Sequence, residues 1–275
     1  MRVFMVAAAG CAAWAGYRFG RSPFGRAAAM AVAVWNPFVV ERLLQGQWSL
    51  AAAGWLLPLV ALGCGPASGL AHWLASLTPT GALAAACFAR GWPGVAVSVC
   101  ICLPWLVASV FADAPGTSSA ASAAAFAPRA EAHVGTLGSL LGLGGIWNGQ
   151  AVPASRELGF ALFGVALSAL LALSWRAVPR RFLLLAAVGF AVAFGSWAGL
   201  TAPLIQHLPG GGLLRDGQKW LILAIPAFVA AAGALEPRRA LAAAAFALLQ
   251  VPDAPVALAA LAPTTCLLYT SLSGL

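Results

Sequence analysis

The sequence predicts an all-α protein that crosses a membrane several times, with about eight to ten helical segments, some of them short and paired. Of its 275 residues, 62% are hydrophobic and 8% are charged, whereas soluble domains are roughly 45–50% apolar and about 25% charged. Apolar segments of about 16–20 residues recur from end to end and lack the alternation of barrel strands. Alanine and glycine are frequent in these segments, and such small residues let helices pack closely in lipid.

Four apolar spans are expected in the first half of the chain, at residues 3–17, 27–40, 49–65 and 93–112. Asn36-Pro37 should interrupt the second span, because proline disrupts the interior of a helix. Residues 67–90 form either one crossing or two short helices that meet at the turn 78–81. We favour the hairpin, because it places Arg90 on the same side of the membrane as most other arginines.

The second half begins with the longest segment that is not expected to span, residues 113–157. Its first part is rich in small polar residues and its second part in glycine, so we expect a mobile loop followed by an interfacial or re-entrant segment. Further spans are expected at residues 158–175, 182–200, 220–235 and, more weakly, 240–262. Residues 1–262 then form one transmembrane domain, and the tail at 263–275 is expected to be unstructured or non-native.

The basic residues are divided unevenly between the two ends of these spans, nine against six. The nine are Arg18, Arg21, Arg26, Arg90, Arg176, Arg180, Arg181, Arg238 and Arg239; the six are Arg2, Arg42, Arg129, Arg156, Arg215 and Lys219. The positive-inside rule makes the richer side cytoplasmic, so loops 41–48, 113–157 and 200–219 are expected outside a cell membrane. The net charge is +8, but nucleic acid is not an expected partner, because the arginines lie singly or in pairs at the ends of apolar spans.

The densest polar feature is the stretch 200–220, where Arg215, Asp216 and Lys219 follow the glycines 210–212. We interpret it as a clamp for an anionic head group such as a lipid phosphate. The guanidinium would bind with two parallel hydrogen bonds, the ammonium would act as a point charge, and the glycines would let backbone N–H groups approach. Asp216 would orient Arg215 or act as a base. The alternative is an interfacial loop whose cations only reach toward lipid head groups.

Four further side chains are candidates for the same site. Gln218 and His207 would add hydrogen bonds to the bound phosphate. Glu41 is either a general base or metal ligand, or simply a polar helix end in water. Trp147 either lines a sugar or lipid groove or anchors the chain at the membrane interface. The six cysteines have no metal-binding spacing, so we expect no metal site, and the sequence specifies no cofactor and no oligomeric state.

Several short phrases together resemble the actinobacterial membrane proteins related to GT-C fold glycosyltransferases, of the arabinofuranosyl- and mannosyltransferase type. The phrases are WNPFVVERLLQGQWSL, LTPTG, TLGSLLGLGGIWN and LLRDGQKW. The resemblance implies many transmembrane helices, a polyprenyl-phosphate sugar donor, and a catalytic Asp or Glu in the first external loop. No DxD-like pair is present here, so we expect a fragment that lacks this acid, with Glu41 as its nearest substitute. Arg215 and Lys219 match the place where such proteins contact the lipid phosphate.

The predicted function is therefore transfer of a sugar from a polyprenyl-phosphate donor to a cell-envelope glycan, with membrane lipid and that donor as partners. Arg215 and Lys219 would hold the phosphate, and Asp216 or Glu41 would assist the transfer. A transporter or lipid flippase remains an alternative, because proline interrupts several spans. A non-catalytic membrane subunit is the third possibility, because the acidic motif of the glycosyltransferases is missing.

Overall fold

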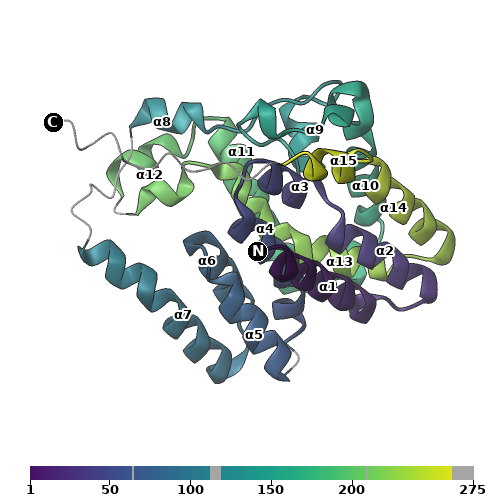
Figure 1. Ribbon diagram of the computed structural model, residues 1–275, viewed down its shortest axis with the longest axis horizontal. Helices are drawn as coiled ribbons and strands as arrows, with labels where there is room; N and C mark the ends of the chain where they lie inside the picture. Colours follow the sequence, from purple (N-terminus) through teal and green to yellow (C-terminus); the bar gives the residue numbers. More distant parts are fainter. Residues whose placement is uncertain (64, 112–118, 209, 262–275) are drawn as a thin grey trace.

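A computed structural model describes residues 1–63, 65–111, 119–208 and 210–261 (Figure 1). Within these residues the chain is helical, and the bridge between Glu131 and Gly135 is isolated rather than part of a strand. The prediction of an all-α fold is confirmed, while the tail at 263–275 lies outside the described residues. The longer helices are α1 (Arg2–Phe19), α2 (Pro23–Val34), α3 (Pro37–Leu44), α4 (Trp48–Leu62), α5 (Gly65–Ala75), α6 (Pro79–Phe88), α7 (Gly91–Phe111), α10 (Ala161–Ala172), α11 (Arg180–Trp197), α13 (Ile225–Gly233) and α14 (Pro237–Leu249). The short helices are α8 (Ala120–Ala125), α9 (Gly135–Leu141), α12 (Ala202–His207) and α15 (Ala254–Ala259).

The helices break where proline and capping residues predict. Asn36 separates α2 from α3, and its side chain accepts a hydrogen bond from the N–H of Val39 at 3.1 Å, which caps the new helix. The segment 67–90 forms two short helices that meet at Thr78, with Pro79 in the first turn of α6. The expected hairpin is therefore present in place of one continuous helix.

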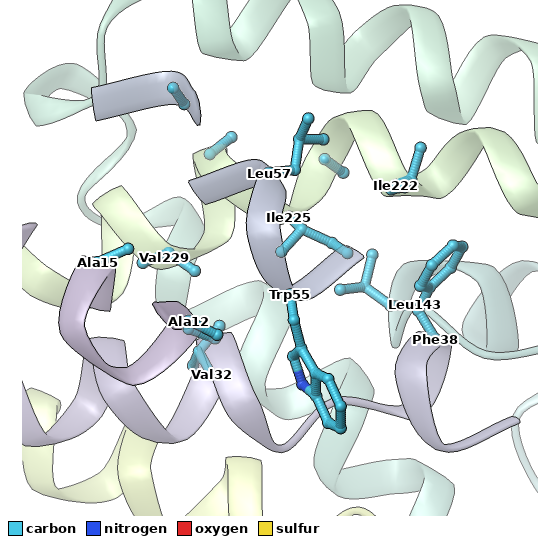
Figure 2. Close-up of a cluster of buried hydrophobic side chains, with 14 of the residues drawn as sticks. Ala12, Ala15, Val32, Phe38, Trp55, Leu57, Leu143, Ile222, Ile225 and Val229 are labelled. Carbon is cyan, nitrogen blue, oxygen red and sulfur yellow. The ribbon is translucent and has the colours of Figure 1, made fainter. Parts of the chain in front are cut away.

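The centre of the bundle is α4, in which every residue from Leu50 to Ala61 is buried. The indole N–H of Trp55 donates to the carbonyl of Val34 at 3.0 Å, which satisfies its polar atom and joins α4 to the end of α2. Side chains from α1, α2, α4 and α13 meet around this helix in Figure 2, among them Ala12, Ala15, Val32, Trp55, Ile225 and Val229. Alanine is the most frequent residue of the buried core as a whole, as the sequence predicts.

Four helical stretches are long and apolar enough to cross a membrane: Pro23–Leu44, Gly91–Phe111, Arg180–Trp197 and Pro237–Ala259. The second of these, α7, exposes Trp92, Val110 and Phe111. An outer surface of this kind is compatible with a membrane protein. In the view of Figure 1 the short helices α3, α8, α9, α12 and α15 lie in the upper half of the molecule, so these short segments gather toward one end.

The packing of α1 on α2 leads to a prediction for Gly16. A Cβ atom there would lie 2.7 Å from backbone atoms of Ala29, so Gly16→Ala should push the helices apart and cost about 1–3 kcal/mol. Gly10, on the same helix, has no atom within 4 Å of its Cβ position, so Gly10→Ala should be neutral or stabilising by up to about 1 kcal/mol. Equilibrium unfolding in mixed micelles measures both, and equal effects would contradict the packing described.

Candidate functional site

The chain between α11 and α13 contains α12 and two tight helical turns, η4 (Gly211–Leu214) and η5 (Gly217–Ala224), where the sequence predicted an open loop. Arg215 and Asp216 lie between these turns, and Lys219 lies in the second. The clamp residues therefore project from short helical turns that pack on the bundle. Backbone fixed in this way positions side chains more firmly than a free loop.

These turns form one wall of a polar cavity of about 410 Å³. The other walls come from the start of α4, the start of α6 and the residue that ends α8. The lining residues are Gly46, Gln47, Ser49, Leu50, Thr78, Thr80, Phe126, Gly212, Arg215, Asp216 and Lys219. Three of the predicted site residues, Arg215, Asp216 and Lys219, are thus brought together on one cavity.

Arg215 is held on an aromatic platform. Its guanidinium carbon lies 4.2 Å from the centre of the Phe126 ring, and its Nη1 donates to Oγ of Ser122 at 3.4 Å. Trp147 packs on the same ring, with 4.5 Å between ring centres. Among the described residues no carboxylate forms an ion pair with Arg215, so its remaining N–H groups are available to an anion. Trp147 supports this platform and does not itself line the cavity.

Lys219 is largely buried beside the same cavity. Burial lowers the pKa of its ammonium group to about 8; Asp216 opposes this shift, while Arg42 and Arg215 add to it. No acidic group of the described chain forms an ion pair with Lys219. An anion bound in the cavity would therefore contact an ammonium group that has lost part of its own contact with water.

Asp216 pairs with Arg42 and not with Arg215, in contrast to the role expected from its place beside Arg215. Its two carboxylate oxygens accept hydrogen bonds from Arg42 at 2.5 and 3.1 Å. This two-pronged geometry is the strongest form of an arginine–carboxylate pair. Because Arg42 neutralises Asp216, the cavity keeps the positive charge of the other two clamp residues.

Arg42 also binds two glutamines, which satisfy further N–H groups of its two Nη atoms, while its buried Nε has no partner among the described residues. Its Nη1 donates to Gln47 Oε1 at 2.7 Å, and its Nη2 donates to Gln218 Oε1. The amide nitrogen of Gln218 lies 3.4 Å from the carbonyl oxygens of Leu143 and Gly144. Gln218 is fully buried, so it connects the clamp to the long loop and has no free group for the substrate contact that the sequence predicted.

Glu41 lies in a second buried cluster and does not line the cavity. It is 0% exposed, so the alternative that it marks a helix end in water is wrong. Its Oε2 accepts from the N–H of Ile146 at 3.1 Å, and its Oε1 lies 3.7 Å from Nε of Arg156. Nε of Arg156 donates to Oε2 of Glu131 at 2.7 Å. Two carboxylates therefore share one guanidinium, and Glu41 is separated from the cavity where a base would act.

This cluster requires glycine at position 144. A Cβ atom there would lie 2.5 Å from Glu131 Oε1, 2.6 Å from Arg156 Nη2 and 2.7 Å from Glu41 Oε1. No real side chain fits at these distances. Glycine at position 144 of the long loop is thus explained by its close contact with buried charges.

The other predicted residue, His207, is exposed near the end of α12 and is absent from the cavity wall. The sequence reasoning missed the cavity residues Gln47, Thr78, Thr80 and Phe126. Thr78 and Thr80 could have been recognised from the sequence, because they lie in the turn 78–81, which was expected to end one short helix and begin another. Phe126 gave no signal, because a single aromatic residue in a loop is usual.

Comparison of the chain with protein-family models, with curated proteins and with solved structures finds no match. The described residues contain no group of three or more His, Cys, Asp or Glu side chains placed to hold a metal ion.

The shared guanidinium of Arg156 predicts an asymmetry between two substitutions. Arg156→Met should destabilise the fold by about 3–5 kcal/mol, because it leaves two buried carboxylates without a cation. Glu41→Gln should cost about 1 kcal/mol or less, because the pair of Arg156 with Glu131 remains and an amide keeps the hydrogen bond from Ile146. Equilibrium unfolding in mixed micelles measures the difference. A Glu41→Gln variant as unstable as Arg156→Met would contradict the shared-cation arrangement.

Proposed function

We propose that this chain is a multi-pass protein of the cell membrane that binds a lipid-linked phosphate in the cavity of Arg215 and Lys219. We further propose that the bound lipid is a polyprenyl-phosphate sugar donor and that the sugar is transferred to a cell-envelope glycan, as in GT-C glycosyltransferases. The observation that carries the proposal is the presence of two cations without ion-pair partners, among the described residues, on one polar cavity beside apolar helices.

The charges around the cavity favour an anion of the size of a phosphate. Arg215 offers a planar fork of donors and Lys219 a compact charge, the usual pair of groups around phosphate oxygens. The first turn of α6 faces the same cavity, through Thr78 and Thr80, and its N-cap side chain makes no capping hydrogen bond. The positive end of the helix dipole adds to the attraction.

The position of the cavity favours a lipid ligand over a soluble one. It is formed by the short segments that connect the apolar helices, where a lipid head group meets water. The loops 41–48, 113–157 and 200–219 hold five basic residues, six with Arg2 on the same side, against nine on the other side. We therefore place the cavity on the external face of the membrane.

Sugar transfer requires a group that accepts the proton of the acceptor hydroxyl. The hydroxyl oxygen would attack the anomeric carbon, the bond from that carbon to the phosphate oxygen would break, and the polyprenyl phosphate would leave with the bonding electrons. Asp216 is the carboxylate that lines the cavity, so we assign the proton to it, with Arg42 fixing its position. Glu41 is not assigned this role, because it is buried away from the cavity.

Binding of a polyprenyl monophosphate to the protein in phosphatidylcholine nanodiscs tests the clamp. Arg215→Ala and Lys219→Ala should each weaken binding by on the order of tenfold or more, because each removes a charged hydrogen bond to phosphate. Arg239→Ala is the matched control: Arg239 is exposed and belongs to the nine-residue side, so its loss should leave binding unchanged.

Equal loss of affinity in all three variants, or in none, would contradict the phosphate site. An Asp216→Asn variant removes the proposed base. It should lose transfer of sugar from a polyprenyl-phosphate donor by a larger factor than it loses binding of the lipid, which also weakens because Arg42 no longer has its carboxylate partner. A protein that binds the lipid tightly but transfers no sugar with Asp216 intact would instead be a binding subunit or a transporter.

Lys219 makes the binding dependent on pH. Because the pKa of its ammonium group is about 8, affinity for the phosphate should fall as pH rises from 7 to 10 and the lysine loses its charge. The phosphate itself keeps a constant charge over this range, since its second pKa is about 6. Lys219→Arg should remove most of the decline, because arginine stays protonated. A decline of the same size in Lys219→Arg would show that another group titrates.

A further inference from the structure

A larger cavity, of about 700 Å³, lies between α6 and α7 and is called the apolar chamber below. One wall is formed by Pro79, Ala82 and Leu83, which are three and four residues apart and therefore share one face of α6. The opposite wall is a face of α7, the helix that lies beside α6 at the edge of the molecule in Figure 1. The turn η4 forms the remaining wall. None of the described residues that line the chamber is charged.

The wall from α7 offers hydrocarbon surface. Cys102, Trp105, Leu106 and Ser109 line the chamber with the spacing of a single helix face. The indole N–H of Trp105 donates to the carbonyl of Ser76 at 2.9 Å, and the hydroxyl of Ser109 donates to the carbonyl of Leu106 at 2.8 Å. Because the strongest side-chain donors of this wall are already occupied, the chamber suits a hydrocarbon chain better than a polar molecule.

The apolar chamber adjoins the cavity of the two clamp cations along two segments of the chain. At the start of α6, Thr78 and Thr80 line the cation cavity, and Pro79 between them lines the chamber. In η4, Gly212 lines the cation cavity and the next residue, Leu213, lines the chamber. Consecutive Cα atoms are about 3.8 Å apart, so the two spaces are immediate neighbours. A molecule with an anionic head and an apolar tail matches both at once.

We propose that the apolar chamber takes the hydrocarbon chain of the lipid whose phosphate occupies the cation cavity. This inference rests on the function proposed above, because the bound phosphate places the chain. Bilayer chains are as apolar as the chamber walls, so the hydrophobic effect alone does not draw a chain out of the membrane. Attachment to a bound phosphate raises the effective concentration of the chain at the chamber, and contacts with the walls then stabilise it. The site therefore prefers a long-chain phosphate to a short one.

Filling the chamber tests this preference. Binding of a polyprenyl monophosphate and of dimethylallyl monophosphate, which has a single isoprene unit, is measured by native mass spectrometry on the full chain in detergent micelles. Ala108 lines the chamber and is exposed, so Ala108→Trp should fold normally and occupy the space. It should weaken the polyprenyl compound by on the order of tenfold, through lost packing contacts, and leave the short compound unchanged. Val107→Trp, at an exposed neighbour outside the lining, is the matched control and should change neither.

Arg215→Ala separates this proposal from the phosphate site, because it should weaken both compounds. If Arg215→Ala weakens the polyprenyl compound while Ala108→Trp behaves like Val107→Trp, the chamber is overturned and the phosphate site stands. If Ala108→Trp weakens that compound while Arg215→Ala does not, the chamber binds the chain and the phosphate site is wrong. Failure of the unmodified protein to bind the polyprenyl compound would overturn both.

Two natural cysteines of α7 report on the chamber directly. Cys102 lines it and is half-buried, whereas Cys100 is exposed and lies outside the lining. Bound polyprenyl monophosphate should slow alkylation of Cys102 by N-ethylmaleimide, followed by tandem mass spectrometry, and leave that of Cys100 unchanged. Dimethylallyl monophosphate should slow neither. Equal protection of the two thiols, or protection of neither by the polyprenyl compound, would overturn the proposal.

Discussion

The arrangement of the polar end depends on the buried pair of Arg42 and Asp216, which are 174 residues apart in the chain. Removing both charges from water costs several kcal/mol per ion in an ordinary protein interior, about as much as their attraction returns. The pair is stable here because its geometry is two-pronged and because Gln47 and Gln218 satisfy further N–H groups of the guanidinium. Its consequence is geometric: with Asp216 fixed against α3, its neighbour Arg215 and the nearby Lys219 face the cavity.

The short helix α3 joins the polar segments of the molecule to one another. Arg42 binds the segment that contains Asp216, while the adjacent residue Glu41 binds the long loop through Ile146 and Arg156. Two neighbouring residues thus hold two different segments. Gln218 links these two segments to each other, because its amide contacts the backbone of the long loop. A network with this many buried partners gives a preformed cavity, which lowers the ordering cost of binding a ligand.

Much of the helical framework follows from the sequence. Apolar runs rich in small residues predict the bundle, Asn36-Pro37 predicts the separation of α2 from α3, and the turn before Pro79 predicts the hairpin of short helices. The clamp residues Arg215 and Lys219 stand out for a related reason. Charge is so scarce in this chain that a local cluster is conspicuous.

The buried charge pairs could not be predicted in the same way. Arg42 and Glu41 resemble a helix end in water in the sequence, because Asp216 lies 174 residues from Arg42 and Ile146 lies 105 residues from Glu41, and no local pattern connects them. The same limit applies to Gln218, whose hydrogen bonds are all buried.

Direct mapping of a bound lipid tests the central claim, that the cavity of Arg215 and Lys219 holds a lipid-linked phosphate. A polyprenyl monophosphate with a diazirine on its first isoprene unit would be bound to the protein in nanodiscs, photolysed and located by mass spectrometry. We predict adducts in residues 46–50, 78–80 and 212–219, which disappear when unlabelled polyprenyl phosphate is added in excess. Adducts spread over the outer faces of α7 and α14, and unchanged by competition, would contradict the account.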